Sequence, residues 1–332
     1  LRPLTYHMPK PIVPVLDRPM IEHIIRGAVS AGVDELALVV GYKSEMIREE
    51  IGDGSVMGAQ ITYLEQTEYA GTGDALLLAE DYLDEEPFFL SWGDIIVPPN
   101  NYTRIIQQYR TRECDGVLTV NWIDDPYEGA AVYTDGGYVS RIVEKPPKGA
   151  SDTNFNNAGI FVLPPEIFSA LREIPVSDRG ELEATDAIMH IINEGGARLV
   201  AQEIEGYWYD VARPSALLDL NADMLEMLFD DGVMVSEGAE VADGAEIQPP
   251  VYIACGARVG ASQVGPNAVI GEDCVVGDGC CVTQTACFRE ATLADGAQTQ
   301  HAIVAHAAHL PVDHELGGSE DMPACLTRIK SE

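Results

Sequence analysis

Short apolar runs alternate with segments of helical spacing along the first two thirds of the chain. The runs are rich in branched and aromatic residues, which is typical of buried strands, whereas the segments after them repeat apolar residues every three or four positions. The pattern predicts strands at 35–41, 61–64, 88–92 and 117–120 and helices at 44–51, 73–83 and 102–111. Strands this apolar must be covered on both faces, so we expect an α/β domain with a mostly parallel, mixed sheet.

The alternation becomes less regular after residue 120. Shorter elements are expected there, with strands around Ala131, Val139 and Ile160 and helices near Ile167 and Ala184. Residues 216–228 then carry leucine and methionine at helical intervals, and an Asp-Asp-Gly sequence ending at Gly232 predicts the end of this helix. We therefore expect the first domain to span 1–231.

Beyond that boundary, aliphatic residues recur every six positions. The residues in step are Val235, Val241, Ile247, Ile253 and Val259, and, after one five-residue step, Val264, Ile270, Val276 and Val282. Hairpins would instead need period-two alternation and turns every 8–12 residues. The repeat predicts a left-handed parallel β-helix at 232–310, in which each six-residue rung points one aliphatic inward. The weaker pattern at 294–310 is expected to cap it, followed by a tail at 311–332.

The charge of the chain is unusual, whereas its apolar content is ordinary. Hydrophobic residues make up 46% of the 332 residues, as in globular proteins, but 54 acids against 20 bases give a formal net charge of −34. Such a surface repels polyanions, so nucleic acid and anionic membranes are poor partners. The acids are spread over both domains, and one hypothesis is adaptation to a saline cytoplasm, where salt screens self-repulsion.

Other compositional features predict a cytoplasmic protein. No window approaches about 18 consecutive apolar residues, and no basic-then-apolar leader is visible. Seven cysteines form an odd set without a C-x-x-C pair, so small buried thiols are expected rather than disulfides or a zinc site. The exposed sides of a β-helix favour self-association, and we expect a homo-oligomer of unknown size.

The first fifteen residues are rich in proline and basic residues although the chain is acidic. Pro9 and Pro11 stiffen the backbone around Lys10, which lowers the entropy cost of presenting one ammonium group at a fixed point. A proline-rich surface loop is the simpler alternative.

Ordered motifs across 1–230 resemble the sugar-1-phosphate nucleotidylyltransferases. The motifs are L-R-P-L-T followed by P-K-P at 9–11, E-Q at 65–66 with G-T-G at 71–73, W-G-D at 92–94, V-E-K-P at 143–146, N-A-G-I-F at 157–161 and W-Y-D-V at 208–211. The resemblance implies a Rossmann-like sheet of the nucleotide-diphospho-sugar transferase type, and many family members also carry a hexapeptide β-helix. Family members begin with a strand and a G-x-G-T-R loop that this chain lacks, so either the sequence is truncated or the protein is an inactive relative; we favour truncation, because losing a central strand would expose apolar faces.

The resemblance implies a role for several residues in binding the nucleotide. Lys10 is expected to neutralise the triphosphate as pyrophosphate leaves. Gln66 could pair with a pyrimidine edge, and Gly71 would allow the base to approach closely. Thr72 belongs to the same motif, although it could simply cap the helix that follows.

Two aspartates are candidate magnesium ligands. Asp94 follows the apolar run at 88–92, and Asp210 follows a second short run, so both lie after strands, where open α/β sheets bind ligands. Mg²⁺ takes one or two carboxylates together with phosphate oxygens. Either aspartate could instead cap a turn or helix.

The sugar phosphate is assigned to a third group of residues by the same resemblance. Glu144 would accept hydroxyl groups and Lys145 would bind phosphate, although an exposed ion pair is the alternative. Gly129 and Asn157 resemble further sugar-contact positions. Because Asn156 is equally polar, either of the two asparagines could be the one that contacts the sugar. The acidic stretch at 181–186 matches the family but could equally begin a helix, and it receives no role.

The implied reaction is transfer of a nucleotidyl group from a nucleoside triphosphate, with dTTP or UTP preferred, to a sugar 1-phosphate, most simply glucose 1-phosphate. Catalytic roles would fall to Lys10, Asp94 and Lys145. A non-catalytic assembly subunit is one alternative. Acyl transfer in the β-helix is another, because His301, His306, His309 and His314 cluster in the sequence.

Overall fold

The computed structural model describes residues 1–83, 85–228 and 232–327, and the chain folds into two compact units. One unit is 21–208, and the other combines 1–20 with 209–332. The predicted domain boundary at 231 lies outside the described residues, and the boundaries at 231 and 310 stay predictions. No helix among the described residues is long and apolar enough to cross a membrane.

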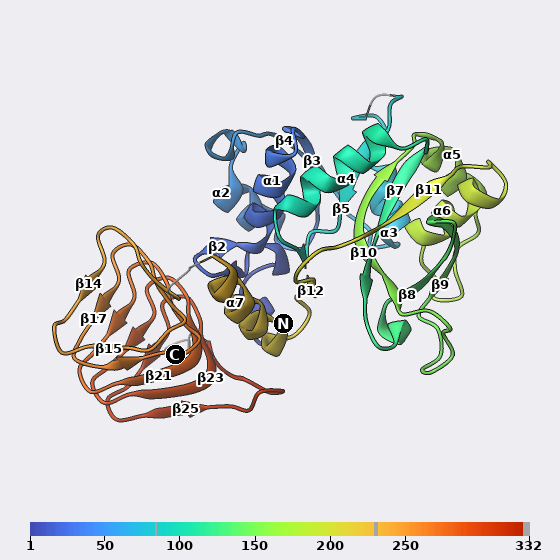
Figure 1. The fold of residues 1–332 in the computed structure, drawn as a ribbon. Coiled ribbons are helices and arrows are strands. Elements are labelled where there is room, and N and C mark those ends of the chain that lie inside the picture. Colours follow the sequence, from blue (N-terminus) through green and yellow to red (C-terminus); the bar gives the residue numbers. More distant parts are fainter. Residues whose placement is uncertain (84, 229–231, 328–332) are drawn as a thin grey trace. The chain divides into compact units, whose positions relative to one another are not determined.

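The 21–208 unit is built on a six-stranded sheet with helices packed against it (Figure 1). The strand order is β5 (Phe88–Ser91), β10 (Phe155–Leu163), β7 (Gly116–Trp122), β11 (Leu199–Glu203), β9 (Tyr138–Glu144) and β8 (Ala130–Asp135). Strands β3 (Glu35–Val40) and β4 (Gln60–Glu65) form a separate parallel pair, and β6 (Ile95–Ile96) follows β5. The helices are α1 (Met20–Ser30), α2 (Ser44–Ile51), α3 (Thr72–Leu77), α4 (Asn100–Thr111), α5 (Glu166–Glu173) and α6 (Ala184–Asn193).

The mixed α/β sheet is confirmed, but the expectation that it is mostly parallel is wrong. Within the six strands only β7 and β11 pair in parallel, whereas β10 runs antiparallel to both β5 and β7, and β8 and β9 form a hairpin. Both β7 and β10 are almost wholly buried, as the apolar runs required. Burial explains the composition of these strands, and it carries no information on their direction.

The helix predicted at 73–83 is shorter, because residues 79–83 form turns bonded to residues 76–79.

The other unit contains short strands stacked in parallel on three ladders. Its first part holds the two-residue strands β1 (Pro14–Val15), β2 (Arg18–Pro19) and β12 (Tyr209–Asp210), and helix α7 (Pro214–Leu228). The first ladder is β13 (Val233–Val235), β16 (Val251–Ile253), β19 (Ala268–Ile270), the second halves of β21 (Cys281–Cys287) and β23 (Gln298–Val304), and β26 (Ala324–Leu326). The second is β14 (Glu240–Val241), β17 (Arg258–Val259), β20 (Val275–Val276), β22 (Thr292–Leu293) and β24 (His309–Leu310). The third is β15 (Glu246–Ile247), β18 (Gln263–Val264), the first halves of β21 and β23, and β25 (Glu315–Gly317).

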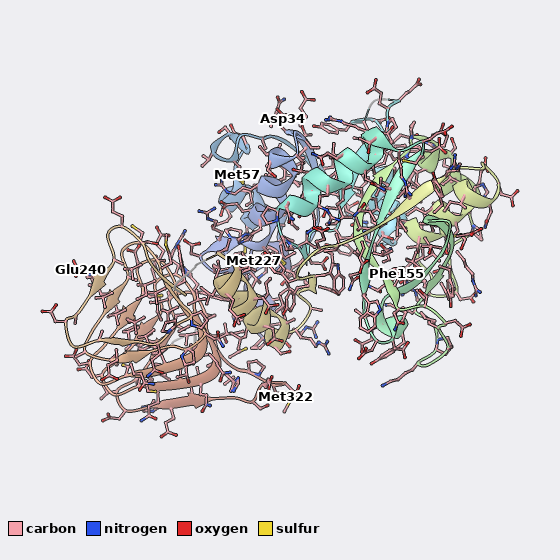
Figure 2. All side chains as sticks on the ribbon, viewed as in Figure 1. Asp34, Met57, Phe155, Met227, Glu240 and Met322 are labelled. Atoms are coloured by element: carbon pink, nitrogen blue, oxygen red, sulfur yellow. The ribbon has the colours of Figure 1, made fainter. Side chains whose placement is uncertain are left out.

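Every aliphatic residue of the predicted six-residue repeat lies in one of these strands. From Ile253 to Val282 their exposure is at most 3%, and they form one core with Leu293, Val304 and Leu310. Acidic side chains such as Glu240 lie on the outside (Figure 2). The expectation that 294–310 forms a cap is wrong, because buried Leu293 and Leu310 continue the second ladder and further strands follow residue 310.

The cysteines are all free thiols. Cys274, Cys280 and Cys287 are buried in the ladder core, whereas Cys255 is exposed. Burial raises the pKa of Cys274 to about 12, so this thiol packs as a small apolar group.

Candidate functional site

Three of the residues assigned to the sugar phosphate meet at the start of β8 and the end of β9. Ala130 of β8 pairs with Glu144 of β9, and the Lys145 backbone N–H donates to the Gly129 carbonyl at 2.7 Å. Lys145 has a φ of 42°, a left-handed conformation that turns the chain immediately after β9. The hairpin register therefore brings Gly129 together with Glu144 and Lys145, which follow it by 15 and 16 positions in the sequence.

Glycine at position 129 is required by a close neighbour rather than by its backbone angles. A Cβ atom there would lie 2.1 Å from Asn156 Oδ1. That oxygen accepts a hydrogen bond from the Ala130 N–H at 3.1 Å, while Asn156 Nδ2 donates to Asn121 Oδ1 at 3.0 Å and to the Asn157 carbonyl at 2.9 Å. The amide of Asn156 is therefore used within the protein to hold β10 against β8 and β7.

Asn157 is as deeply buried as Asn156 but keeps one donor for other use. Its side chain is 3% exposed, and its Oδ1 accepts from the Gly159 N–H at 3.1 Å. Its Nδ2 has no hydrogen-bond partner among the described residues. Because buried polar groups in native proteins are nearly always paired, this donor makes Asn157 a candidate for contact with a ligand. The hydrogen bonds favour Asn157 over Asn156 as the candidate, and its binding role stays a prediction.

A β-bulge next to Asn157 connects it to the W-G-D motif. The register between β10 and β7 shifts between Asn157 and Phe161, and Thr119 Oγ1 bridges the shift by bonding both the N–H and the carbonyl of Ile160. The Gly159 carbonyl within the bulge accepts from the Trp92 N–H at 3.0 Å. Asp94 follows two residues later, after the end of β5, so the strand-end position predicted for it is found.

The three nucleotide-binding candidates lie between the end of β4 and the first residue of α3, which is Thr72. Gln66 Nε2 donates to Asp74 Oδ2 at 3.0 Å, a partner that the sequence pattern did not reveal. Gly71 has a φ of +118°, and a Cβ there would lie 2.4 Å from the Leu182 carbonyl oxygen. Thr72 does not cap its own helix; its Oγ1 accepts from the Ala184 N–H at 3.0 Å, at the start of α6.

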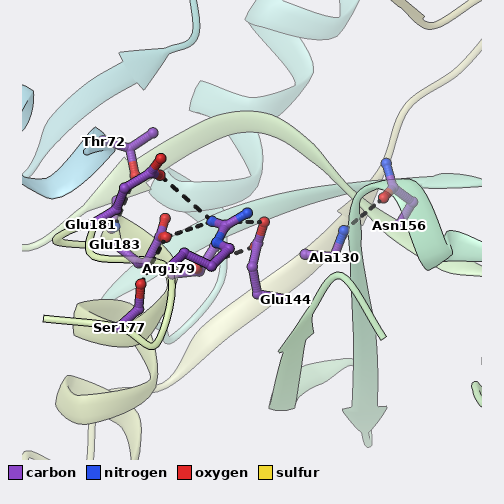
Figure 3. A network of polar contacts seen from close by, with 10 residues as sticks. Thr72, Ala130, Glu144, Asn156, Ser177, Arg179, Glu181 and Glu183 are labelled. Atoms are coloured by element: carbon purple, nitrogen blue, oxygen red, sulfur yellow. Dashed lines mark hydrogen bonds and ion pairs between the residues drawn. The ribbon is translucent and has the colours of Figure 1, made fainter. Parts of the chain in front are cut away.

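Glu144 lies in a polar network (Figure 3). The network includes residues of the acidic stretch at 181–186, to which the sequence analysis assigned no role. Arg179 approaches Glu144 Oε1 at 3.6 Å and also pairs with Glu181 and Glu183, and Thr185 Oγ1 lies 3.4 Å from Glu144 Oε2. Burial raises the pKa of Glu144, an effect opposed by Arg179 and increased by Glu183. The acidic stretch at 181–186 was visible in the sequence, but its contact with Glu144 could not be predicted because it depends on the tertiary fold.

Lys10 and Asp210 meet in the other unit. Lys10 Nζ lies 3.1 Å from Asp210 Oδ1, and their side chains are 27% and 47% exposed. Asp94 belongs to the 21–208 unit, so a joint magnesium site of Asp94 and Asp210 stays a prediction. No three His, Cys, Asp or Glu side chains of the described ranges converge on a metal site, and a pair of carboxylates completed by phosphate oxygens needs no such group.

The four candidate histidines of the ladders lie mostly at the surface. His306, His309 and His314 are exposed and His301 is partly buried. His306 Nε2 lies 4.0 Å from Glu290 Oε2, and both side chains are exposed. These observations give the alternative of acyl transfer no support.

Comparisons with known proteins give a consistent result. A family model described as Nucleotidyl transferase matches residues 1–227, and one described as GMPPB C-terminal domain matches residues 247–312. The low-salt glycan biosynthesis nucleotidyltransferase Agl11 of Haloferax volcanii is 32% identical over 228 residues, 68% of this chain and 63% of that protein. A glucose-1-phosphate thymidylyltransferase of Streptomyces griseus is 32% identical over 279 residues, 80% of this chain and 78% of that protein. A crystal structure of UDP-glucose pyrophosphorylase complexed with UDP-glucose shares the fold, with a TM-score of 0.60 at 20% identity, covering 68% of this chain and 94% of that one. The match thus spans less than two thirds of the Haloferax protein.

Proposed function

Because this chain belongs to the nucleotidyl transferase family, we propose that it transfers a nucleotidyl group from a nucleoside triphosphate to a sugar 1-phosphate. A phosphate oxygen of the sugar phosphate forms a bond to the α-phosphorus of the triphosphate, and the bond to pyrophosphate breaks in line. The nucleophile needs no general base, because the second pKa of a phosphate monoester is about 6. The obstacle is repulsion between two anions, which positive side chains and fixed geometry reduce.

The observation that carries this proposal is the meeting of three residues in the 21–208 unit, with a fourth on an adjacent strand. Gly129, Glu144 and Lys145 meet at the β8–β9 hairpin, and Asn157 on the neighbouring strand β10 has a donor with no partner in the described part of the chain. A carboxylate, an amide donor and an ammonium suit a ligand with several hydroxyl groups and one phosphate. Lys10 would neutralise the triphosphate, and Gln66 would read the base beside Gly71 and Thr72.

Magnesium is the expected cofactor, with Asp94 and Asp210 as its protein ligands. Their carboxylates are hard oxygen donors of the kind Mg²⁺ selects, and each lies at or just after the end of a short strand. When bound, the ion would neutralise charge on the triphosphate. Lys10, already 3.1 Å from Asp210, would then hold the phosphates from the protein side.

We further propose dTTP or UTP as donor and glucose 1-phosphate as acceptor. The amide of Gln66 supplies one donor and one acceptor, as a pyrimidine edge requires, and relatives of this chain are named as thymidylyl- and uridylyltransferases.

The three parallel ladders and their six-residue repeat support a left-handed β-helix, whose exposed sides would mediate self-association. Light scattering on the purified protein would test self-association, and a monomeric mass would contradict it.

The decisive experiment follows pyrophosphate release from each pairing of dTTP, UTP, ATP and GTP with glucose 1-phosphate and N-acetylglucosamine 1-phosphate. We expect turnover with a pyrimidine triphosphate and glucose 1-phosphate, and its loss on adding EDTA. Replacing Lys145 by methionine should raise the KM for the sugar phosphate, while Lys148→Met, three residues away, serves as the matched control. A complete lack of turnover with all pairings would instead favour a non-catalytic subunit.

A further inference from the structure

The segment that carries Lys10 belongs to the same compact unit as the ladders, the unit of 1–20 and 209–332. Lys10 starts a single turn of 3₁₀ helix, and its carbonyl accepts a hydrogen bond from the Val13 N–H at 3.1 Å. The Val13 carbonyl in turn accepts from the Met20 N–H at 3.0 Å, just after β2, the antiparallel partner of β1. The backbone of Lys10 is therefore linked directly to the β1–β2 hairpin.

The turn of this hairpin is strained and is held by other parts of the unit. Leu16 has a φ of 55°, a left-handed conformation that costs energy for a bulky residue and persists only where the surroundings enforce it. Its N–H donates to Asn221 Oδ1 of α7 at 2.7 Å, and the Asn221 side chain is buried. The next residue, Asp17, accepts a hydrogen bond from the Tyr252 hydroxyl through Oδ2. Contacts with α7 and with the ladders thus fix this turn.

Tyr252 is the outward-facing residue of strand β16. Its neighbours Val251 and Ile253 belong to the ladder core, whereas Tyr252 lies on the opposite face of the strand and is still only 9% exposed. Burial and the bond to Asp17 raise the pKa of Tyr252 to about 12, so its hydroxyl stays protonated at neutral pH. Ser236 donates to the same hydroxyl oxygen at 3.3 Å. Tyr252 therefore offers Asp17 a hydrogen-bond donor throughout the neutral pH range.

Helix α7 also holds the residue beside Asp210. The helix packs against β1, β12 and β21, so it contacts a strand near each member of the Lys10–Asp210 pair and a strand of the ladders. Two residues after Asn221, Asp223 Oδ2 accepts a hydrogen bond from the Tyr209 hydroxyl at 2.8 Å. The two segments that form the ion pair are thus anchored on one helix, and the ladders support that helix and the hairpin together.

From these contacts we propose that Tyr252 is a positioning residue for Lys10: through Asp17 and the hairpin, the ladders hold the ammonium group where pyrophosphate release needs it. The inference rests on the proposed function and adds to it a part for the C-terminal ladders in the reaction. Lys10 acts on charge that develops as pyrophosphate leaves, so a shift of its backbone slows transfer more than it weakens substrate binding. Loss of the Tyr252 hydroxyl should therefore lower kcat with little change in either KM.

The test compares Tyr252→Phe in the whole chain with wild type in steady-state kinetics. A misplacement of about 1 Å can cost about a hundredfold in rate, and loss of one bond to the turn should lower kcat about tenfold, with both KM values changed less than about twofold. Ser236→Ala is the matched control, because it removes a bond to the same hydroxyl and keeps the bond to Asp17; it should behave as wild type. Asp17→Ala should reproduce the kinetics of Tyr252→Phe, and the double variant should lose no more than either single variant.

Two further measurements separate positioning from folding. In Lys10→Met the ammonium group is absent, so adding Tyr252→Phe should lower kcat no further. Acetylation by acetic anhydride, followed by mass spectrometry, reports on Lys10 without any turnover. Lys10 should be modified faster in Tyr252→Phe than in wild type, because its ion pair with Asp210 is held less firmly, whereas Lys148 of the 21–208 unit should react at the same rate. Thermal unfolding checks that each variant is folded, and Asp17→Ala, which leaves the ladder strand unchanged, decides if Tyr252→Phe is not.

Several results would overturn the inference. They are a wild-type kcat in Tyr252→Phe, equal losses in Tyr252→Phe and Ser236→Ala, effects of Tyr252→Phe and Lys10→Met that multiply, and unchanged acetylation of Lys10. Each of these would leave the proposed function standing. A wild-type protein that releases no pyrophosphate would instead refute the proposed function, and this inference with it.

Discussion

Lys10 Nζ and Asp210 Oδ1 lie 3.1 Å apart although 200 positions separate them in the chain. The resemblance to the family assigned one residue to the triphosphate and the other to magnesium, on separate motifs. Their contact places two opposite charges of the proposed reaction at one point, with both side chains still partly exposed. A bound triphosphate could therefore reach Lys10 without unfolding its surroundings.

Replacing Lys10 by methionine should lower kcat by about a hundredfold or more, because a charge that opposes the developing negative charge of the leaving group is lost. An exposed ion pair contributes at most about 1 kcal/mol, so the unfolding midpoint should change little. Steady-state kinetics and thermal unfolding measure the two effects. Lys10→Arg, which keeps the charge, is the control and should retain more activity; a large drop in stability without loss of kcat would contradict the assignment.

The neighbouring asparagines of β10 should respond differently to alanine. Asn156→Ala removes three hydrogen bonds from a buried amide and should cost about 2–4 kcal/mol of unfolding free energy. Asn157→Ala loses one bond, to the Gly159 N–H, and also removes a donor that has no partner among the residues described, so it should cost about 1 kcal/mol or less. Chemical denaturation compares the two. Equal losses would show that Asn157 is paired within the folded protein and is no candidate for ligand binding.

Gly129→Ala tests the close approach of Asn156 to the hairpin. The added methyl group would lie 2.1 Å from Asn156 Oδ1, and relieving that overlap must disturb the bonds of Asn156. We expect a loss of about 2 kcal/mol, as for other overpacked sites. Gly317→Ala is the control, because no atom lies within 4 Å of a Cβ at that position. A similar stability of both variants would refute the steric argument.

Periodicity predicted the parts of this fold in which burial repeats along the chain. The aliphatic residues from Ile253 to Val282 are buried in the ladders as the six-residue repeat requires, and the strands of the first domain lie where the apolar runs place them. Strand direction was not predictable, because β10 is equally apolar whether its neighbours run parallel or antiparallel. Arg179 was missed for a related reason: it lies between α5 and α6, its partner Glu144 ends strand β9, and only the tertiary fold unites them.

The excess of acids predicts that salt stabilises the protein. With a formal net charge of −34, the folded state concentrates negative charge that the unfolded chain spreads over a larger volume, and the Debye length shrinks from about 10 Å at 0.1 M to about 3 Å at 1 M salt. The thermal unfolding midpoint should therefore rise by several degrees between 0.1 and 1 M sodium chloride. Sodium sulfate at equal ionic strength separates screening from salting-out, because sulfate also strengthens apolar burial. If chloride leaves the midpoint unchanged and only sulfate raises it, self-repulsion does not limit the stability of this protein.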